Sequence, residues 1–475
     1  MRRHLAILMV ASALAAPAAS HAQTAEKPTD PSRARFLALY KEMVETDTTY
    51  SVGSCTLAAE QVAARLKAAG FPDADVHVLV PDGKPRFGAL AAILHGTDKT
   101  APPLLLLAHI DVVEAKRSDW KRDPFKLIEE DGYYYGRGTN DDKAMAASFA
   151  DILIRYRQEG FQPRRDIKLA LTCGEETSDQ FDGAQYLTEH DRWAVQAGMA
   201  LNEGGAGLLD DQGRPLANAI QAGEKIYQDY RLVVTNLGGH SSRPRKDNAV
   251  YQLAHALVRL EASPFPVRLS PVTRAYFTAM ASLTPDPLAA DLRAMGGPNL
   301  PPADVLARVA QDPAWNSTMR TTCVATQVNA GHAPNALAQH AEANVNCRIL
   351  PDETVEQTRL ALEQAIDDKD VVVSLAAQPS PQSPAPPLTD AVLGPARQVS
   401  NQIWPSVPLI PTMATGGTDG AFTNAAGIPT YGLGGIFRDP DGDGIHGLNE
   451  RIRIRSLYDS REFLYRVVRL YASTG

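Results

Sequence analysis

The sequence lacks the features that mark several large classes of protein. After the N-terminus it has no run of about 18 consecutive apolar residues, so we expect no membrane span. The net charge is −8 and there is no basic block, so we expect no nucleic-acid partner. Four cysteines in 475 residues do not make a disulfide framework. With 44% hydrophobic residues, the chain can form a globular protein of about two domains.

Residues 1–22 have the composition of a secretory signal peptide. Two arginines precede the apolar run Leu5–Ala16, and Ser20–Ala22 is a small-x-small cleavage site. We therefore expect this segment to be removed. The mature protein would be secreted, or periplasmic where the source has two membranes.

Two of the cysteines could pair across strands. Cys323 and Cys347 lie on two strand-like runs, almost symmetrically about Asn335, so a bridge is conceivable in an oxidising compartment. We expect two unpaired buried thiols instead, because free cysteine is commonly buried.

The first half of the chain alternates helical and strand-like segments. This alternation predicts an α/β domain with a mainly parallel sheet flanked by helices. The expected helices are Pro31–Thr46, Cys55–Ala69 and Asn140–Glu159, and the expected strands are Asp75–Val80, Phe87–His95, Leu104–His109 and Ile167–Thr172.

The pattern changes near residue 224 and returns after residue 382. We predict a catalytic domain in two parts, residues 23–223 and 383–475, with an α+β lid domain inserted at residues 224–382. The proline-rich segment Pro379–Pro387 is typical of a stiff linker that closes the insertion. Expected elements of the lid are the strands Tyr227–Thr235, Thr321–Asn329 and His340–Leu350 and the helices Asn248–Leu260 and Thr354–Asp367.

The apolar run Leu169–Thr177 ends at two adjacent carboxylates, Glu175 and Glu176. Open α/β folds place their chemistry at such strand ends. A metal could take one carboxylate as a ligand, and the other could then move protons. Taken alone, a solvated loop with two acids would explain the pair equally well.

Other metal-ligand residue types are expected at the same edge. A second buried strand ends at His109, and Asp111 could accept the other ring proton of that histidine. Asp141 lies in a glycine-rich loop, either as a helix cap or as a bridge between two cations. Glu203 follows an apolar stretch, and His446 lies in a late loop. One histidine, one acid and a shared aspartate per ion would build two metal sites.

Six motifs, in their order and spacing, resemble the co-catalytic di-zinc metallopeptidases. That family includes aminoacylase, carnosinase, glutamate carboxypeptidase, acetylornithine deacetylase and succinyl-diaminopimelate desuccinylase. The resemblance runs from about Asp30 to the C-terminus and rests on LLLLAHIDVVEA, YYYGRGTNDDKAMA, LTCGEE, LNEGG, GGHSSRP and GIHGLNE.

The resemblance implies two zinc ions, with cobalt or manganese as possible replacements. It implies that His109, Asp141 and Glu203 hold one ion. Asp141, Glu176 and His446 would hold the other. Glu175 would be the general base, and Asp111 would orient His109.

The resemblance also implies roles for three lid residues. His240 would stabilise the reacting carbonyl, often from the partner subunit of a homodimer formed through the lid. Asn335 and Arg348 would grip the substrate's carbonyl and carboxylate. The segment Asn335–Ala338 departs from the common Asn-x-Ile-Pro, and Ala144 stands where the family usually has glycine.

The function implied is hydrolysis of an amide or peptide bond next to an amino acid with a free carboxylate. The substrate would be an N-acyl amino acid or a short peptide, as for an aminoacylase or carboxypeptidase. A dipeptidase of the same family is an alternative. A non-catalytic metal-dependent binding protein is another, but it would have no need of Glu175 as a base.

A rival motif lies near the C-terminus. Asp439–Gly444, followed by Glu450, fits the twelve-residue calcium loop. However, Pro440 lies inside the motif, and His446 stands where an aliphatic residue is usual. We therefore expect His446 to serve as a zinc ligand and the calcium-binding module to be absent.

Overall fold

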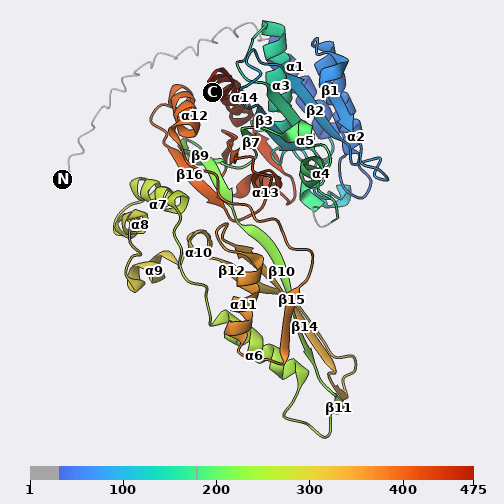
Figure 1. Cartoon of the computed structure of the whole chain (residues 1–475), viewed down its shortest axis with the longest axis vertical. Helices are drawn as coiled ribbons and strands as arrows, with labels where there is room; N and C mark the ends of the chain where they lie inside the picture. The colour runs from blue at the N-terminus through green and yellow to red at the C-terminus, as the bar shows by residue number, and fades with distance from the viewer. Residues whose placement is uncertain (1–30, 178–179, 475) are drawn as a thin grey trace, which may run out of the picture.

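The computed structural model describes residues 31–177 and 180–474. The expected signal peptide, residues 1–22, lies outside the described residues. Two parts follow one another along the long axis of the molecule, a larger α/β part and a smaller α+β part (Figure 1). Within the described residues, every helix is either too short or too polar to cross a bilayer.

The larger part is built on a mixed ten-stranded sheet, in the order β1-β2-β6-β3-β7-β17-β9-β8-β18, with β16 paired to β9. Its central strands β6, β3, β7 and β17 are parallel, which confirms the expected fold class. Antiparallel pairs flank them on both sides. The strands are β1 (Val76–Leu79), β2 (Ala89–Leu94), β3 (Leu104–His109), β6 (Ile167–Thr172), β7 (Met199–Asn202), β8 (Gly207–Leu209), β9 (Pro215–Glu224), β16 (Leu409–Ala414), β17 (Thr430–Gly432) and β18 (Phe437–Arg438).

Helices cover both faces of this sheet. The side chains of β3 alternate between two buried clusters, because successive residues of a strand point to opposite faces. One face carries α1 (Pro31–Glu45), α2 (Cys55–Ala68), α3 (Lys143–Glu159), α12 (Asp390–Ile403) and α14 (Ile454–Ser473); the other carries α4 (Gly183–Glu189) and α5 (Arg192–Val195), with α13 (Gly420–Ala425) beside α4.

The smaller part begins where β9 continues, after Lys225, into β10 (Ile226–Thr235). Its antiparallel sheet has the order β12-β14-β10-β15, and two helices pack on one face of it. A two-stranded antiparallel sheet, β11 with β13, lies near the tip (Figure 1). The elements are α6 (Ala249–Glu261), α11 (Val355–Ile366), β11 (Gly239–His240), β12 (Thr322–Ala330), β13 (Ala336–Leu337), β14 (His340–Ile349) and β15 (Val371–Leu375).

A helical segment that the sequence patterns did not define lies between α6 and β12. It has a small hydrophobic core of its own, and α7 packs against β16 and β9 of the larger sheet. Its helices are α7 (Pro271–Leu283), α8 (Leu288–Gly296), α9 (Ala303–Val309) and α10 (Pro313–Met319). The remaining elements are β4 (Ile128–Glu130), β5 (Tyr133–Tyr135), β19 (Arg451–Arg453) and the short 3₁₀ turns η1 (Asp73–Asp75), η2 (Arg117–Asp119), η3 (Glu175–Thr177) and η4 (Gly442–Gly444).

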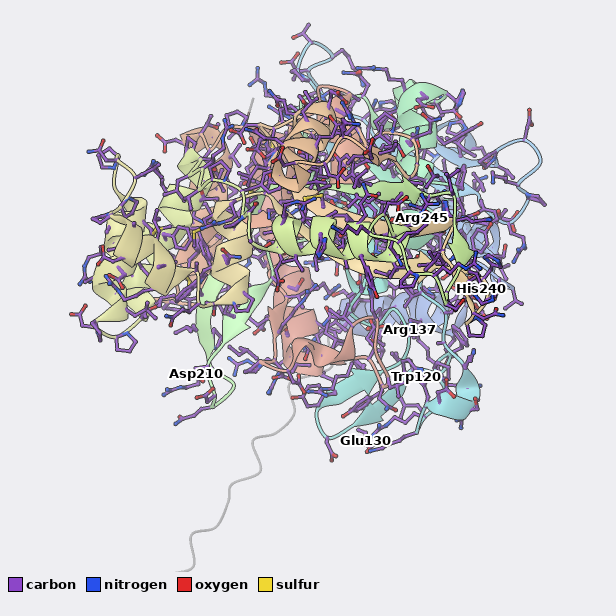
Figure 2. All side chains as sticks on the ribbon, turned by 90° about the horizontal axis from the view of Figure 1, so that it is seen from below. Trp120, Glu130, Arg137, Asp210, His240 and Arg245 are labelled. Atoms are coloured by element: carbon purple, nitrogen blue, oxygen red, sulfur yellow. A yellow bond between two sulfur atoms is a disulfide. The ribbon has the colours of Figure 1, made fainter. Side chains whose placement is uncertain are left out.

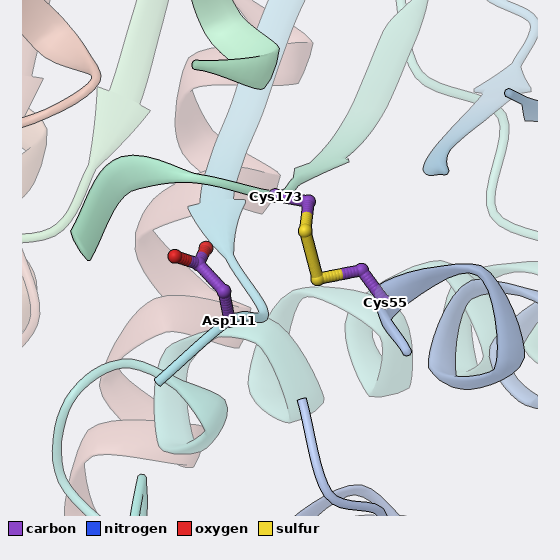
Figure 3. Close-up of side chains that lie close together, drawn as sticks. All are labelled: Cys55, Asp111 and Cys173. Atoms are coloured by element: carbon purple, nitrogen blue, oxygen red, sulfur yellow. A yellow bond between two sulfur atoms is a disulfide. The ribbon is translucent and has the colours of Figure 1, made fainter. Parts of the chain in front are cut away.

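The expectation of unpaired thiols is wrong, because all four cysteines are in disulfides. Cys323 and Cys347 are directly opposite in the register of β12 and β14, with Cα atoms 4.1 Å apart, so their side chains meet across the strands. Cys55 at the start of α2 bonds Cys173 just after β6, next to Asp111 (Figure 3). This second bridge joins residues 118 positions apart, a separation that no local pattern reports.

Candidate metal centre

The carboxyl ends of three neighbouring parallel strands supply most of the site. β3 ends at His109, the turn after β6 carries Glu175 and Glu176, and Glu203 follows β7 directly. Because these strands are parallel neighbours, their carboxyl ends meet at one edge of the sheet. His446 reaches the same edge from the loop after η4.

Asp141 lies between the two histidines. Its Oδ1 is 3.1 Å from Nε2 of His109, and its Oδ2 is 3.2 Å from Nε2 of His446. Nε2 of His446 is also 2.9 Å from Oε2 of Glu176, and Nε2 of His109 is 3.8 Å from Oε1 of Glu203. The two oxygens of Asp141 thus face different histidines, which is the arrangement a carboxylate needs to bridge two cations.

The donor set suits divalent transition metals. The ligand atoms of His109, Asp141 and Glu176 lie within 4.8 Å of one another, and so do those of His109, Glu175 and Glu203. Imidazole nitrogens mixed with carboxylate oxygens are the ligands that zinc takes in catalytic sites. The residues that the sequence predicted as ligands are therefore brought together in the structure.

Asp111 lies where it can influence two of these residues. Its backbone carbonyl is 3.1 Å from Nδ1 of His109, and its Oδ1 is 3.6 Å from the same nitrogen. The backbone N–H of Glu176 donates to Oδ2 of Asp111 at 3.1 Å. When the other ring nitrogen of a histidine, here Nδ1, is held in this way, the orientation of its metal-binding nitrogen is fixed.

The cluster contains more carboxylates than histidines, and burial together with mutual repulsion disfavours the ionised form of the carboxylates. Burial raises the pKa of Glu203 to about 8. Burial, followed by the charge of Glu203, raises the pKa of Glu175 well above its usual value. Hydrogen bonds with Asp141 and Glu176 raise the pKa of His446 to about 10. Burial also opposes ionisation of Asp141, but its contacts with the two histidines outweigh burial and lower its pKa. Bound cations would offset the excess of carboxylates, so these residues fit a metal centre.

The helix predicted over Asn140–Glu159 begins later, at Lys143, with Asp142 as its N-cap. The backbone N–H groups of Asn140 and Asp141 donate to Oε1 of Glu450, at 2.8 and 3.1 Å, instead of entering the helix. This role of Glu450 differs from the calcium-ligand role that its place in the acidic motif predicts. The sequence feature that points to this role is the position of Glu450 four residues after His446, in the motif GIHGLNE.

Two carboxylates of the acidic motif near the C-terminus are paired with arginines. Asp441 is 2.7 Å from Arg451, and Arg453 donates to Oδ1 of Asp439 at 2.6 Å. Glu450 is fully buried against the loop described above. Asp439, Asp441 and Asp443 nevertheless lie close enough together to hold a metal ion, so the absence of a calcium-binding module stays a prediction.

A cavity of about 250 Å³ opens beside the cluster. Glu175, Glu176 and His446 line it on one side, and Lys225 and Arg348 line it at the junction with the smaller part. Arg348 is therefore near the candidate centre. Lys225 was not anticipated, because a single lysine at a strand junction carries no pattern.

His240 and Asn335 lie elsewhere. Figure 1 places β11, which contains His240, at the end of the smaller part that is remote from β3 and β7. His240 is exposed, and its Nδ1 accepts from the hydroxyl of Ser242 at 2.8 Å. Figure 2 labels it with Arg245, on the same segment between β10 and α6. Within one chain, the structure does not bring these two predicted substrate contacts to the cluster.

Comparison with known proteins agrees with the class that this fold and site define, a metal-dependent peptidase. Residues 105–470 match the model described as peptidase family M20/M25/M40. The human N-fatty-acyl-amino acid synthase/hydrolase PM20D1 is 31% identical over 387 residues, which cover 79% of this chain and 75% of that protein. The probable carboxypeptidase S-like 2 of Dictyostelium discoideum is 27% identical, with 79% and 72% covered.

Solved structures share the fold. The M20 family metallo-carboxypeptidase Sso-CP2 from Sulfolobus solfataricus has a TM-score of 0.67 at 18% identity, with 92% of this chain and 99% of that chain covered. Human carnosine dipeptidase 1 has a TM-score of 0.62 at 16% identity, with 93% and 97% covered. The chain belongs to peptidase family M20/M25/M40. It is accordingly a hydrolase of the peptidase and amidohydrolase class.

Proposed function

We propose that this protein removes an acyl or peptidyl group from an amino acid that has a free carboxylate. One observation carries the proposal: the same cavity is lined by Glu175, by the candidate metal ligands Glu176 and His446, and by Arg348. An amide bond placed at the cluster would then leave a carboxylate within reach of Arg348. Two relatives, named as an N-fatty-acyl-amino acid synthase/hydrolase and as a probable carboxypeptidase, support the same substrate class.

We propose two zinc ions as the native cofactors, with cobalt or manganese as possible replacements. His109, Asp141 and Glu203 would hold one ion, and Asp141, Glu176 and His446 the other. Such ions, when bound, polarise the scissile carbonyl and lower the pKa of a water molecule to about 7. A solved M20 relative from Bacillus subtilis, described as a dinuclear metal binding peptidase, supports the number of ions.

Glu175 would move the proton. It lines the cavity next to the candidate metal ligands. From there it would take a proton from the attacking water and deliver it to the leaving nitrogen. Asp111 would hold the ring of His109 in place, and Arg348 would bind the carboxylate through two parallel hydrogen bonds.

The test is hydrolysis and metal content measured together. N-acyl amino acids and dipeptides are assayed with and without a chelator, for the parent, for Glu175→Gln and for the exposed control Glu189→Gln. We expect Glu175→Gln to keep its metal and lose about 10²–10⁴-fold in kcat, the range of general acid–base catalysis, while the control keeps full activity. A requirement for a free α-amino group would identify a dipeptidase. Bound metal without turnover of any substrate would instead indicate a binding protein.

We also propose that the protein is exported. The N-terminal sequence and the two disulfides support this, because disulfides persist in oxidising compartments. Mass spectrometry of the mature protein from its natural source should give an N-terminus near Gln23. An intact Met1 would contradict the proposal.

We infer that His240 acts in a homodimer, on the substrate of the partner subunit. Its exposure at the lid tip, away from the metal-ligand cluster of its own chain, supports this assignment. Strand β12 offers an exposed edge of the lid sheet for such an association.

A further inference from the structure

Lys225 is a buried cation without an acidic partner. Its side chain is 1% exposed, and its Nζ donates to two neutral hydroxyls, Ser317 Oγ at 3.2 Å and Thr322 Oγ1 at 3.3 Å. Within the described residues it forms no ion pair. A buried ammonium that is satisfied only by hydroxyls is costly unless an anion comes close to it.

A second cation lies next to it. Arg348 in β14 is directly opposite Thr322 of β12, so the two side chains rise on the same face of the sheet, about 5 Å apart at Cβ. Nζ of Lys225 binds the hydroxyl of Thr322, and Thr322 is the cross-strand neighbour of Arg348. Lys225 and Arg348 therefore contact or adjoin the same residue. After burial, the charge of Arg348 is the next largest cause that lowers the pKa of Lys225, to about 7.

Arg348 is also without a carboxylate partner in the described part of the chain. Its guanidinium lies 4.5 Å from the centre of the Tyr227 ring, and its Nε donates to Oδ1 of Asn346 at 3.3 Å. Stacking on an aromatic ring fixes the plane of a guanidinium and leaves its outer N–H groups available.

The carboxylate whose charge acts on Lys225 is bound to other residues. Glu353 acts on Lys225 through space, but its carboxylate binds Nη1 of Arg268 at 3.4 Å and the hydroxyl of Thr321. The cavity is therefore lined both by acids and His446 of the metal-ligand cluster and by Lys225 and Arg348, which form no ion pair within the described residues.

We propose that Lys225 binds the free carboxylate of the substrate together with Arg348, and that it makes the enzyme selective for substrates with that carboxylate. The inference rests on the proposed function, since it assumes that this cavity takes the substrate. The ligand class is the carboxylate of an N-acyl amino acid or of a peptide C-terminus, which would neutralise both cations at once.

The test compares the N-acyl amino acid that is hydrolysed fastest in the panel with its C-terminal carboxamide. We expect Lys225→Met to raise KM for the acid by about 10–100-fold, the value of one or two hydrogen bonds between charged groups, with a smaller effect on kcat. The preference for the acid over the carboxamide should fall by the same factor. Lys225→Arg, which keeps the charge, should recover most of it.

Lys369→Met is the matched control, because Lys369 is an exposed lysine of the lid. If Lys225→Met does not fold, Lys225→Gln retains donors for the two hydroxyls and serves in its place. An unchanged acid-to-carboxamide ratio in a folded Lys225 variant, with the ratio lost in Arg348→Met, would overturn the inference and leave the proposed function standing. Failure of the parent to hydrolyse any substrate would overturn both.

Discussion

Arg137 and Glu450 form a buried ion pair that hydrogen-bonds to the loops carrying two candidate metal ligands, Asp141 and His446. Nη1 of Arg137 donates to Oε2 of Glu450 at 2.7 Å, and Nη2 donates to the carbonyl of Gly447 at 2.8 Å. Glu450 also accepts from three backbone N–H groups of the loop that ends at Asp141, including that of Asp141 itself at 3.1 Å. Gly447 directly follows His446, so one arginine and one glutamate fix the loops of both ligands.

Removing the carboxylate of Glu450 should therefore loosen the metal centre. Glu450→Ala leaves Arg137 buried and unpaired, so we expect a loss of about 3–5 kcal/mol in the free energy of unfolding of the metal-free protein. Glu450→Gln keeps an acceptor for Asn140 and Asp141 but loses the charge that pairs with Arg137. We expect it to weaken metal binding by about 10–100-fold, measured by competition with a chelator.

The control for this pair is an arginine–glutamate pair at the surface. Arg122 donates to both oxygens of Glu130, at 2.8 and 2.6 Å, but Glu130 is exposed. Glu130→Gln should leave both unfolding and metal affinity unchanged, because exposed pairs are screened by water. Equal effects of the two glutamine variants would refute a special role for Glu450.

The two disulfides should stabilise the fold to different extents. The Cys55–Cys173 bond spans 118 residues and the Cys323–Cys347 bond spans 24. Loop-closure entropy then predicts losses of about 5 and about 3.5 kcal/mol when each pair is replaced by alanine, measured by denaturant unfolding. Because Cys173 is two residues from Glu175, only the first double variant should also lower kcat. Free thiols detected in the native protein would contradict the premise.

The stability of the metal-free protein should fall as the pH rises. Burial raises the pKa of Glu224 to about 8, more than its hydrogen bond from Thr418 lowers it. The folded state thus holds a proton that the unfolded chain releases above its usual value of 4.5. This contribution is fully present below pH 4.5 and is lost as the pH rises through about 8.

Glu224→Gln should reduce this slope, because glutamine keeps an acceptor for the Thr418 hydroxyl but does not ionise. The free energy of unfolding is measured between pH 5 and pH 8 in the presence of a chelator, with Glu189→Gln as the exposed control. A slope equal to that of the parent would show that Glu224 is not the group responsible.

Sequence periodicity predicted the elements that depend on local pattern. The apolar run that ends at His109 is a central parallel strand, and the alternating run after Lys225 is β10 of the four-stranded sheet in the smaller part. Both strands could be predicted because the spacing of apolar residues shows which faces of a segment are buried. The pairing of Glu450 with Arg137 joins residues 313 apart, and α7 packs on β16 through a surface that no sequence period reveals. Such contacts depend on which segments meet after folding, and one sequence alone does not report this.

If His240 acts across a dimer, two inactive variants should complement each other. Glu175→Gln lacks the base but presents an intact lid, whereas His240→Ala lacks the lid histidine but keeps the base. Mixed in equal amounts and allowed to exchange subunits, half of the dimers are hybrids, and each hybrid has one complete site. We therefore expect about a quarter of the parent activity, since the two sites of a two-fold dimer are otherwise independent. His240→Asn offers a milder variant with the same expectation. No recovery in a mixture shown by size-exclusion chromatography and mass spectrometry to contain hybrids would mean that His240 does not serve the partner's site, and that the lid tip has another use.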